Sequence, residues 1–148
     1  MKTIELEVKE LIAAYSNFCR NYQLLTSING VGPVTAIVIL CSTLNFTKIT
    51  DHRKFACYCG LAPFEHSSGT SVRGGCHTSS MANRDIKVQL NRSALIAIRC
   101  DPQLKAYYER KVAEGKHKFS VLNAVRAKIA ARCFAVVRRG TPYVALQI

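Results

Sequence analysis

The sequence predicts a mainly α-helical domain, and three observations lead to this fold class. Apolar residues recur every three or four positions along most of the chain, as they do on one face of a helix. A chain of 148 residues that is 49% hydrophobic can bury one real core but not two ordinary ones. Only residues 61–80 lose the helical period, because they are rich in glycine, serine and threonine, so a loop or short β-hairpin insert is expected there.

The first 25 residues predict one long helix. Its apolar side chains alternate in spacings of four and three, which makes a heptad seam. The seam consists of Ile4, Val8, Leu11, Tyr15, Phe18, Tyr22 and Leu25. Three heptads fit a dimerising coiled coil and a helix folded back on its own domain equally well. We therefore divide the chain into a helical connector, residues 1–25, and a main domain, residues 26–148.

The later helices follow from residues that start and stop helices. Pro33 can begin one helix, Asp51 is a good N-cap, and Gly60 is a good terminator. Ser120 is expected to cap the last helix, and Gly140 to end it. The expected helices are residues 34–44, 51–59, 83–100, 102–114 and 120–140.

The positive charge is concentrated in the second half of the chain. The formal net charge is +12, and residues 73–148 hold fifteen of the 21 Lys and Arg but only four of the nine Asp and Glu. Such an excess attracts polyanions through phosphate neutralisation, so nucleic acid is the expected partner. A membrane surface fits less well, because no strongly amphipathic cationic terminus is present.

The chain shows no targeting or membrane segment, so we expect a cytoplasmic protein. Three glutamates interrupt the first ten residues, and the longest apolar run, Val34 to Cys41, is too short to span a bilayer. The seven cysteines lie among apolar residues, which suits reduced thiols. Cys57, Cys59, Cys76 and His77 do not match zinc spacing, so no metal site is predicted.

The turn around Gly30, Val31 and Gly32 has the form of a helix-hairpin-helix. In that motif glycines let backbone amides approach a phosphate at a helix N-terminus, where anions are favoured. It would hold DNA by its backbone without reading bases. The alternative is a tight turn between two helices that never meets DNA.

Two later helices each predict an apolar side and a cationic side. Such faces are usually only solvated, but two of them in one small domain favour phosphate contact. The residues expected to bind DNA there are Arg84, Lys87, Arg92 and Arg99 on the first helix, and Lys128, Arg132 and Arg139 on the second.

The stretch from Gly60 to Gly74 is the most suggestive of chemistry. It collects hydroxyls, an imidazole, a carboxylate and an arginine in a glycine-rich loop, a set suited to nucleophilic attack on a phosphate or carbonyl. By composition alone this is only suggestive, because loops rich in serine, threonine and glycine are common and most of them are ordinary turns.

Several motifs, in order along residues 24–143, resemble the C-terminal domain of one group of insertion-sequence transposases. They are Leu24 to Gly32, Phe55 to Gly74, Asn83-Arg84, Tyr107 to Arg110 and Gly140 to Tyr143. These transposases are serine-dependent recombinases with a RuvC-like N-terminal domain, and some use a bridge RNA as guide. Asn29 departs from the family, which usually has proline there.

The resemblance implies that Ser68 is a nucleophile that attacks a DNA phosphodiester. Arg73 is then the local candidate to stabilise the phosphate charge, with Ser71 and His66 in support. The metal-binding carboxylates of the family lie in the RuvC-like domain, so no cofactor is expected in this chain and Mg²⁺ only with that domain. The chain is expected to be inactive alone.

The resemblance also implies a homo-oligomer through residues 4–25, DNA as partner and, in guided members, RNA. Two other functions compete. One is a non-catalytic helix-hairpin-helix module that binds DNA, with Ser68 as a turn residue. The other is a structural protein that dimerises through its first helix and uses its charge only for solubility.

Overall fold

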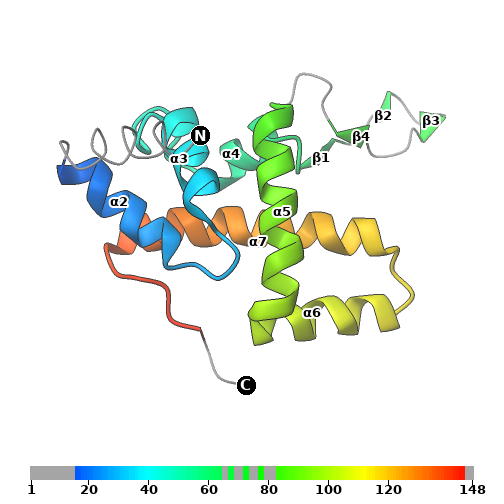
Figure 1. The fold of residues 1–148 in the computed structure, drawn as a ribbon. Coiled ribbons are helices and arrows are strands. Elements are labelled where there is room, and N and C mark those ends of the chain that lie inside the picture. The colour runs from blue at the N-terminus through cyan, green and yellow to red at the C-terminus, as the bar shows by residue number, and fades with distance from the viewer. Residues whose placement is uncertain (1–15, 65–66, 69–71, 74–76, 79–82, 146–148) are drawn as a thin grey trace.

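A computed structural model describes residues 16–64, 67–68, 72–73, 77–78 and 83–145, and it is mainly helical (Figure 1). This confirms the predicted fold class. The described helices are α2 (Ser16–Thr26), α3 (Pro33–Thr43), α4 (His52–Tyr58), α5 (Arg84–Cys100), α6 (Pro102–Ala113) and α7 (Lys118–Arg139). The strands, of two residues each, are β1 (Pro63–Phe64), β2 (Ser67–Ser68), β3 (Val72–Arg73) and β4 (His77–Thr78).

Helix α7 is the centre of the fold, because it packs against α2, α4, α5 and α6. Figure 1 shows α5 crossing over it, while α6 runs back beside it. Its apolar face contributes Val125, Ile129 and Cys133, none of which is exposed. These residues meet Leu90 of α5 and Phe55 of α4 in one hydrophobic cluster. No helix within the described ranges is both long enough and apolar enough to cross a membrane.

The described part of the predicted heptad seam folds back onto its own domain. Helix α2 packs against α3 and α7, and its Leu24 and Leu25 are buried in the core. Phe18 and Tyr22 pack against the same core. Residues 16–25 of the predicted connector thus belong to the main core, while the seam residues before them lie outside the described residues.

Most helix ends lie where local chemistry predicts them. The carboxylate of Asp51 accepts a hydrogen bond from the amide of Arg53 (3.0 Å), and the amide oxygen of Asn83 accepts from the amides of Asp85 and Ile86. Gly140 ends α7 with a φ of +70°, a conformation that glycine adopts at little cost.

The prediction that Ser120 caps the last helix is wrong. Helix α7 begins at Lys118 with His117 as N-cap, and Ser120 lies inside its first turn. The carbonyl oxygen of His117 already accepts the amides of Ser120 and Val121, at 2.9 and 3.1 Å. Helical hydrogen bonding therefore starts three residues earlier than a serine cap would set it.

The predicted insert contains two short antiparallel ladders, one nested inside the other. β1 pairs with β4, so that Pro63 lies opposite Thr78 and Phe64 opposite His77. β2 pairs with β3, and both of these strands lie between β1 and β4 in the sequence. Figure 1 shows these strands extending away from the helical body, beyond one end of α5. We call residues 63–78 the serine hairpin.

Candidate nucleic-acid interface

The serine hairpin carries the predicted nucleophile in β2. Ser68 lies opposite Val72, and its neighbour Ser67 lies opposite Arg73. The ladder therefore brings the backbones of Ser68 and Arg73 into adjacent positions. The supporting residues predicted beside them, His66 and Ser71, lie outside the described residues.

Both ends of the hairpin are hydrogen bonded to the helical body. Before β1, Leu61 is buried, its amide donates to the carbonyl oxygen of Ala56 (2.8 Å), and its own carbonyl accepts from Nδ2 of Asn123 on α7 (2.8 Å). After β4, the amide of Asn83 donates to the carbonyl oxygen of Tyr58 on α4 (3.0 Å), and its Nδ2 donates to the Tyr58 hydroxyl (3.3 Å). The hairpin thus leaves the body between two fixed points.

An arginine that the sequence analysis did not single out lies behind the first of these points. Arg126 donates from Nη2 to Oδ1 of Asn91 on α5 (2.7 Å) and from Nη1 to Oδ1 of Asn123 (3.5 Å). Its Nε is buried without a hydrogen-bond partner. Removal from water lowers the pKa of this guanidinium, and within the described residues no carboxylate pairs with it.

The predicted helix-hairpin-helix glycines have different surroundings. Gly30 has a φ of +92°, and a Cβ added there would lie 2.5 Å from the carbonyl oxygen of Ser93 and 2.9 Å from Cβ of Ala97. Val31 is buried. Gly32 is the N-cap of α3 in extended conformation, and an added Cβ there would meet nothing within 4 Å. Gly30 is therefore explained by close packing against α5, whereas Gly32 leaves the start of α3 open.

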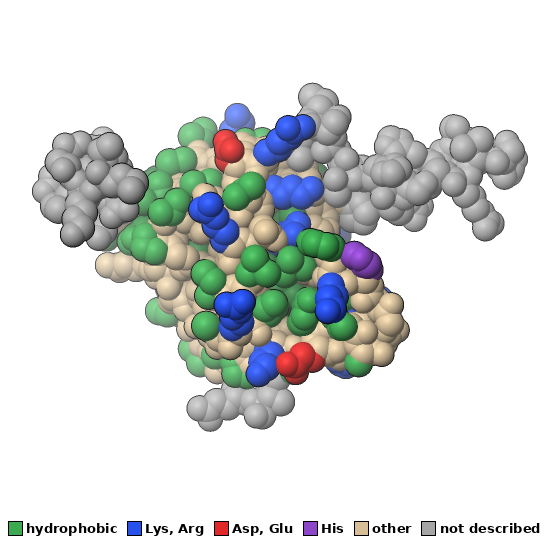
Figure 2. Space-filling view, turned by 45° about the vertical axis from the view of Figure 1, so that its right-hand side comes forward, with side chains coloured by type: hydrophobic (Ala, Val, Ile, Leu, Met, Phe, Trp, Pro, Cys, Tyr) green, Lys and Arg blue, Asp and Glu red, His purple; other side chains and the backbone are tan. Residues whose placement is uncertain are grey.

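The outer face of α5 presents the predicted arginines to solvent. Arg84, Arg92 and Arg99 are exposed, and within the described part of the chain none of them forms an ion pair. Val88 and Leu95, which are 49% and 42% exposed, share this face with them. Figure 2 shows such a mixture of basic and hydrophobic side chains across one side of the molecule. Lys87 is half-buried at its edge.

The predicted basic residues of α7 are more constrained. The Nζ of Lys128 lies 4.5 Å from the ring centre of Tyr107 on α6, in a cation–π contact. Both residues, with Arg110, line a groove of about 520 Å³ between α6 and α7. Arg139 donates to the Thr141 hydroxyl and to the carbonyl oxygen of Pro142.

Arg132 has a clear structural partner. Its Nη1 donates to Oδ2 of Asp101, a side chain with no exposed area, at 2.8 Å. The Tyr143 hydroxyl donates to the same oxygen (2.9 Å), and the Leu104 amide donates to Oδ1 (2.9 Å). Burial raises the pKa of Asp101, but the hydrogen bonds from Leu104 and Tyr143 and the charge of Arg132 outweigh it and hold the pKa below its usual value.

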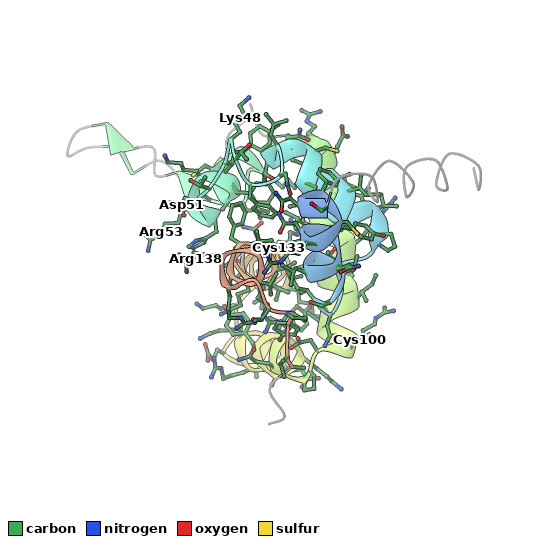
Figure 3. The ribbon with its side chains drawn as sticks, turned by 90° about the vertical axis from the view of Figure 1, so that its left-hand side faces the viewer. Lys48, Asp51, Arg53, Cys100, Cys133 and Arg138 are labelled. Carbon is green, nitrogen blue, oxygen red and sulfur yellow. The ribbon has the colours of Figure 1, made fainter. Side chains whose placement is uncertain are left out.

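Two further basic side chains, Arg53 and Arg138, were not singled out from the sequence. Figure 3 shows Arg53 of α4 and Arg138 of α7 pointing outward on the same side. Both are exposed. Arg138 is the residue before Arg139 at the end of α7, so the run of charges there was a signal that could have identified it. In the part of the chain that the structure describes, no three His, Cys, Asp or Glu gather to hold a metal ion.

Comparisons with known proteins identify the family of this chain. Residues 22–109 match the model of the transposase family described as IS116/IS110/IS902. Over 143 residues the chain is 35% identical to the protein named "Insertion element IS110 uncharacterized 43.6 kDa protein" of Streptomyces coelicolor, covering 96% of this chain and 34% of that relative. The chain therefore belongs to the IS116/IS110/IS902 family of transposases.

Two further relatives extend the comparison. The pilin gene-inverting protein of Moraxella bovis is 23% identical over 141 residues, which cover 95% of this chain and 44% of that protein. The IS900 uncharacterized 42 kDa protein of Mycobacterium paratuberculosis is 30% identical over 112 residues, covering 74% and 28%. The chain spans less than half the length of each of these relatives.

Proposed function

We propose that this chain is the DNA-binding and strand-cleaving part of a transposase, in which Ser68 attacks a DNA phosphodiester. The observation that carries the proposal is membership of a transposase family, with the match to the family model covering residues 22–109 and therefore the whole serine hairpin. The concentration of positive charge after residue 72 supports it, because a DNA strand must be held beside the nucleophile.

In the proposed step, Oγ of Ser68 attacks the phosphorus of one phosphodiester. An Oγ–P bond forms and the P–O bond to the departing deoxyribose breaks, which leaves a phosphoserine link and a free strand end. The hydroxyl proton passes to a base as the bond forms, and the departing oxygen takes up a proton. A serine hydroxyl is a weak nucleophile at neutral pH, so it also needs positive charge at the phosphate oxygens, for which Arg73 is the candidate.

Among the described residues no three acidic, histidine or cysteine side chains gather, so none of them is assigned to Mg²⁺. We place Mg²⁺, as the family resemblance implies, in a separate RuvC-like domain and derive no step through it. On this proposal the chain by itself is sufficient to bind DNA, but it cleaves DNA only together with that domain.

The test is to combine the protein with its RuvC-like partner and DNA that carries an insertion-sequence end. A covalent protein–DNA adduct is then sought on a denaturing gel. We expect Ser68→Ala to abolish the adduct and Ser67→Ala, its neighbour in β2, to retain it. An adduct that survives Ser68→Ala would refute the serine assignment.

A non-catalytic DNA-binding module is the second candidate, favoured by the exposed arginines on α5. It predicts salt-dependent DNA binding with no Ser68-dependent adduct under any condition that supports cleavage. Parallel titrations with labelled duplex DNA and with single-stranded RNA of equal length measure the affinity for each. They show whether the basic residues bind the phosphates of a DNA substrate or those of a guide RNA.

We also propose that the protein acts as a homo-oligomer. The apolar side chains of α2 are already used in the core, so a dimer seam has to draw on the part of residues 4–25 that precedes Ser16. Sedimentation of the whole chain and of a chain lacking residues 1–15 tests this. Equal molecular masses for the two would contradict a seam in that segment.

A further inference from the structure

The serine hairpin has one root on each side, and the two roots are held differently. At the second root, Asn83 bonds Tyr58 through its backbone as well as its side chain. At the first root, Asn123 of α7 supplies the side-chain hydrogen bond that reaches the Leu61 carbonyl. The orientation of the first root relative to α7 therefore depends on where the amide group of Asn123 is held.

Arg126 holds that amide group. It lies three residues after Asn123 on α7 and bonds Oδ1 of both Asn123 and Asn91. Asn123 is thus used at both ends, since its oxygen accepts from Arg126 while its nitrogen donates to Leu61. The chain of contacts links α5, α7 and the start of the hairpin. We call Asn91, Arg126 and Asn123 the brace.

The contribution of the brace to folding stability does not by itself explain why residue 126 is an arginine. A guanidinium that is partly removed from water and faces two neutral amides recovers less energy than one paired with a carboxylate. One of its nitrogens, Nε, is buried and makes no hydrogen bond. An apolar residue of similar length at position 126 would avoid this penalty, so stability gives little reason for an arginine there.

A phosphate site at Arg126 is disfavoured by the same geometry. Both terminal nitrogens already donate to side chains within the protein, and Nε is covered. The donors are directed inward, toward α5 and the hairpin root, rather than toward a ligand.

We propose that Asn123 and Arg126 are positioning residues that fix the direction in which the serine hairpin leaves the helical body. They thereby place Ser68 against the DNA held by the basic residues of α5 and α7. The proposal rests on the proposed role of Ser68. It assigns neither residue any contact with the reacting atoms.

A matched pair of substitutions separates the two bonds of the brace. Asn91→Asp places a carboxylate opposite Arg126 and leaves the Leu61 bond intact. Asn123→Asp also places a carboxylate opposite Arg126, but it removes the donor to Leu61 and turns an oxygen toward the carbonyl. Both variants gain a similar ion pair, so they should fold alike, and only the second releases the first root.

The first measurement is hydrogen exchange of the Leu61 amide, which donates to Ala56 in the wild type. We expect exchange of the Leu61 amide to be about tenfold faster or more in Asn123→Asp and less than twofold faster in Asn91→Asp. In Asn123→Asp the Leu61 carbonyl loses its hydrogen bond to residue 123, so the segment around Leu61 opens more easily. Arg126→Met provides a second route, with accelerated Leu61 exchange and unchanged or higher melting temperature. If the Leu61 amide exchanges at the wild-type rate in both Asn123→Asp and Arg126→Met, the proposed role of the brace is refuted.

The second measurement separates DNA affinity from reaction. In the reconstituted cleavage assay we expect Asn123→Asp to slow adduct formation at least tenfold while the Kd for DNA changes less than twofold. A merely structural role would move both quantities or neither. If Asn123→Asp and Asn91→Asp react at the same rate, this inference fails and the proposed function stands. If the wild type forms no Ser68-dependent adduct, both fail.

Discussion

Replacing Gly30 by alanine should strongly destabilise the protein, whereas the same change at Gly32 should not. Gly30 has a φ of +92° and lies so close to α5 that an added Cβ would be 2.5 Å from the carbonyl oxygen of Ser93. Because that atom belongs to the backbone of a packed helix, it cannot rotate away. At Gly32 the backbone is extended and the space is open.

Two costs add at Gly30. A left-handed conformation costs a residue with a Cβ about 1–2 kcal/mol. Forcing the turn away from α5 adds about 1–3 kcal/mol of overpacking. The total of roughly 2–5 kcal/mol corresponds to a fall in Tm of roughly 5–15 °C for a chain of this size. Gly32→Ala should cost less, about 0.5–1 kcal/mol, since alanine is a poorer N-cap than glycine.

Thermal unfolding followed by circular dichroism, with urea titrations at a fixed temperature, measures both variants against the wild type. Equal stabilities for Gly30→Ala and Gly32→Ala would refute the packing argument. The same pair tests the DNA-binding interpretation of the turn, because only Gly32→Ala leaves a well-folded protein in which a weaker Kd for DNA can be assigned to the start of α3.

Three other outcomes are expected. The pKa of Asp101 is lowered on folding. Its ionised carboxylate therefore stabilises the folded protein at pH values above the unfolded pKa, and this stabilisation is lost as the pH falls through the folded pKa. Unfolding curves between pH 2 and 7 should therefore show Asp101→Asn losing about 3–5 kcal/mol near neutrality, because Arg132 is left unpaired, and less at acid pH; equal losses at both pH values would contradict this. Arg92→Ala should leave Tm unchanged and reduce the slope of log K against log salt for DNA by about one, and an unchanged slope would remove Arg92 from the interface. Burial raises the pKa of the Cys59 and Cys133 thiols to about 12, so iodoacetamide should alkylate neither in the folded protein, while exposed cysteines react.

Figure 3 shows why the cysteine experiment is selective. Cys133 lies among the packed helices, whereas Cys100 lies at the edge of the molecule. Cys133 has no exposed area, and Cys100 is exposed. Mass spectrometry of digested protein locates the alkylated positions, and early labelling of Cys133 would show that α7 opens locally.

The sequence predicted the helices well because their ends are set by nearby residues. Asp51, Asn83 and Gly140 act on backbone groups within a few positions of themselves, so their effects can be read from the sequence alone. Ser120 misled because His117, three residues earlier, had already begun the helix. A good capping residue competes with its neighbours, and a local rule does not say which one wins.

The candidate site was only partly predictable for a different reason. The expected position of Ser68 in a short hairpin comes from residues close in sequence, and the structure places it in β2. The contacts of Arg126 with Asn91 and of Arg132 with Asp101 join residues 35 and 31 positions apart. They depend on how α5 and α6 are rotated against α7, which the apolar period of one helix does not determine.

The central position of α7 also has a consequence for the order of synthesis. Helix α3 is among the most apolar segments of the chain, yet α7, around which the core forms, is the last described helix to be made. At about 5–20 residues per second, the ribosome needs roughly 4–15 s to add the residues that separate the two helices. The Tyr143 amide, which donates to the Ser27 hydroxyl across 116 positions, arrives later still. During translation the early helices therefore remain without their central partner, and this is the period in which chaperone binding or aggregation of the nascent chain would compete with folding.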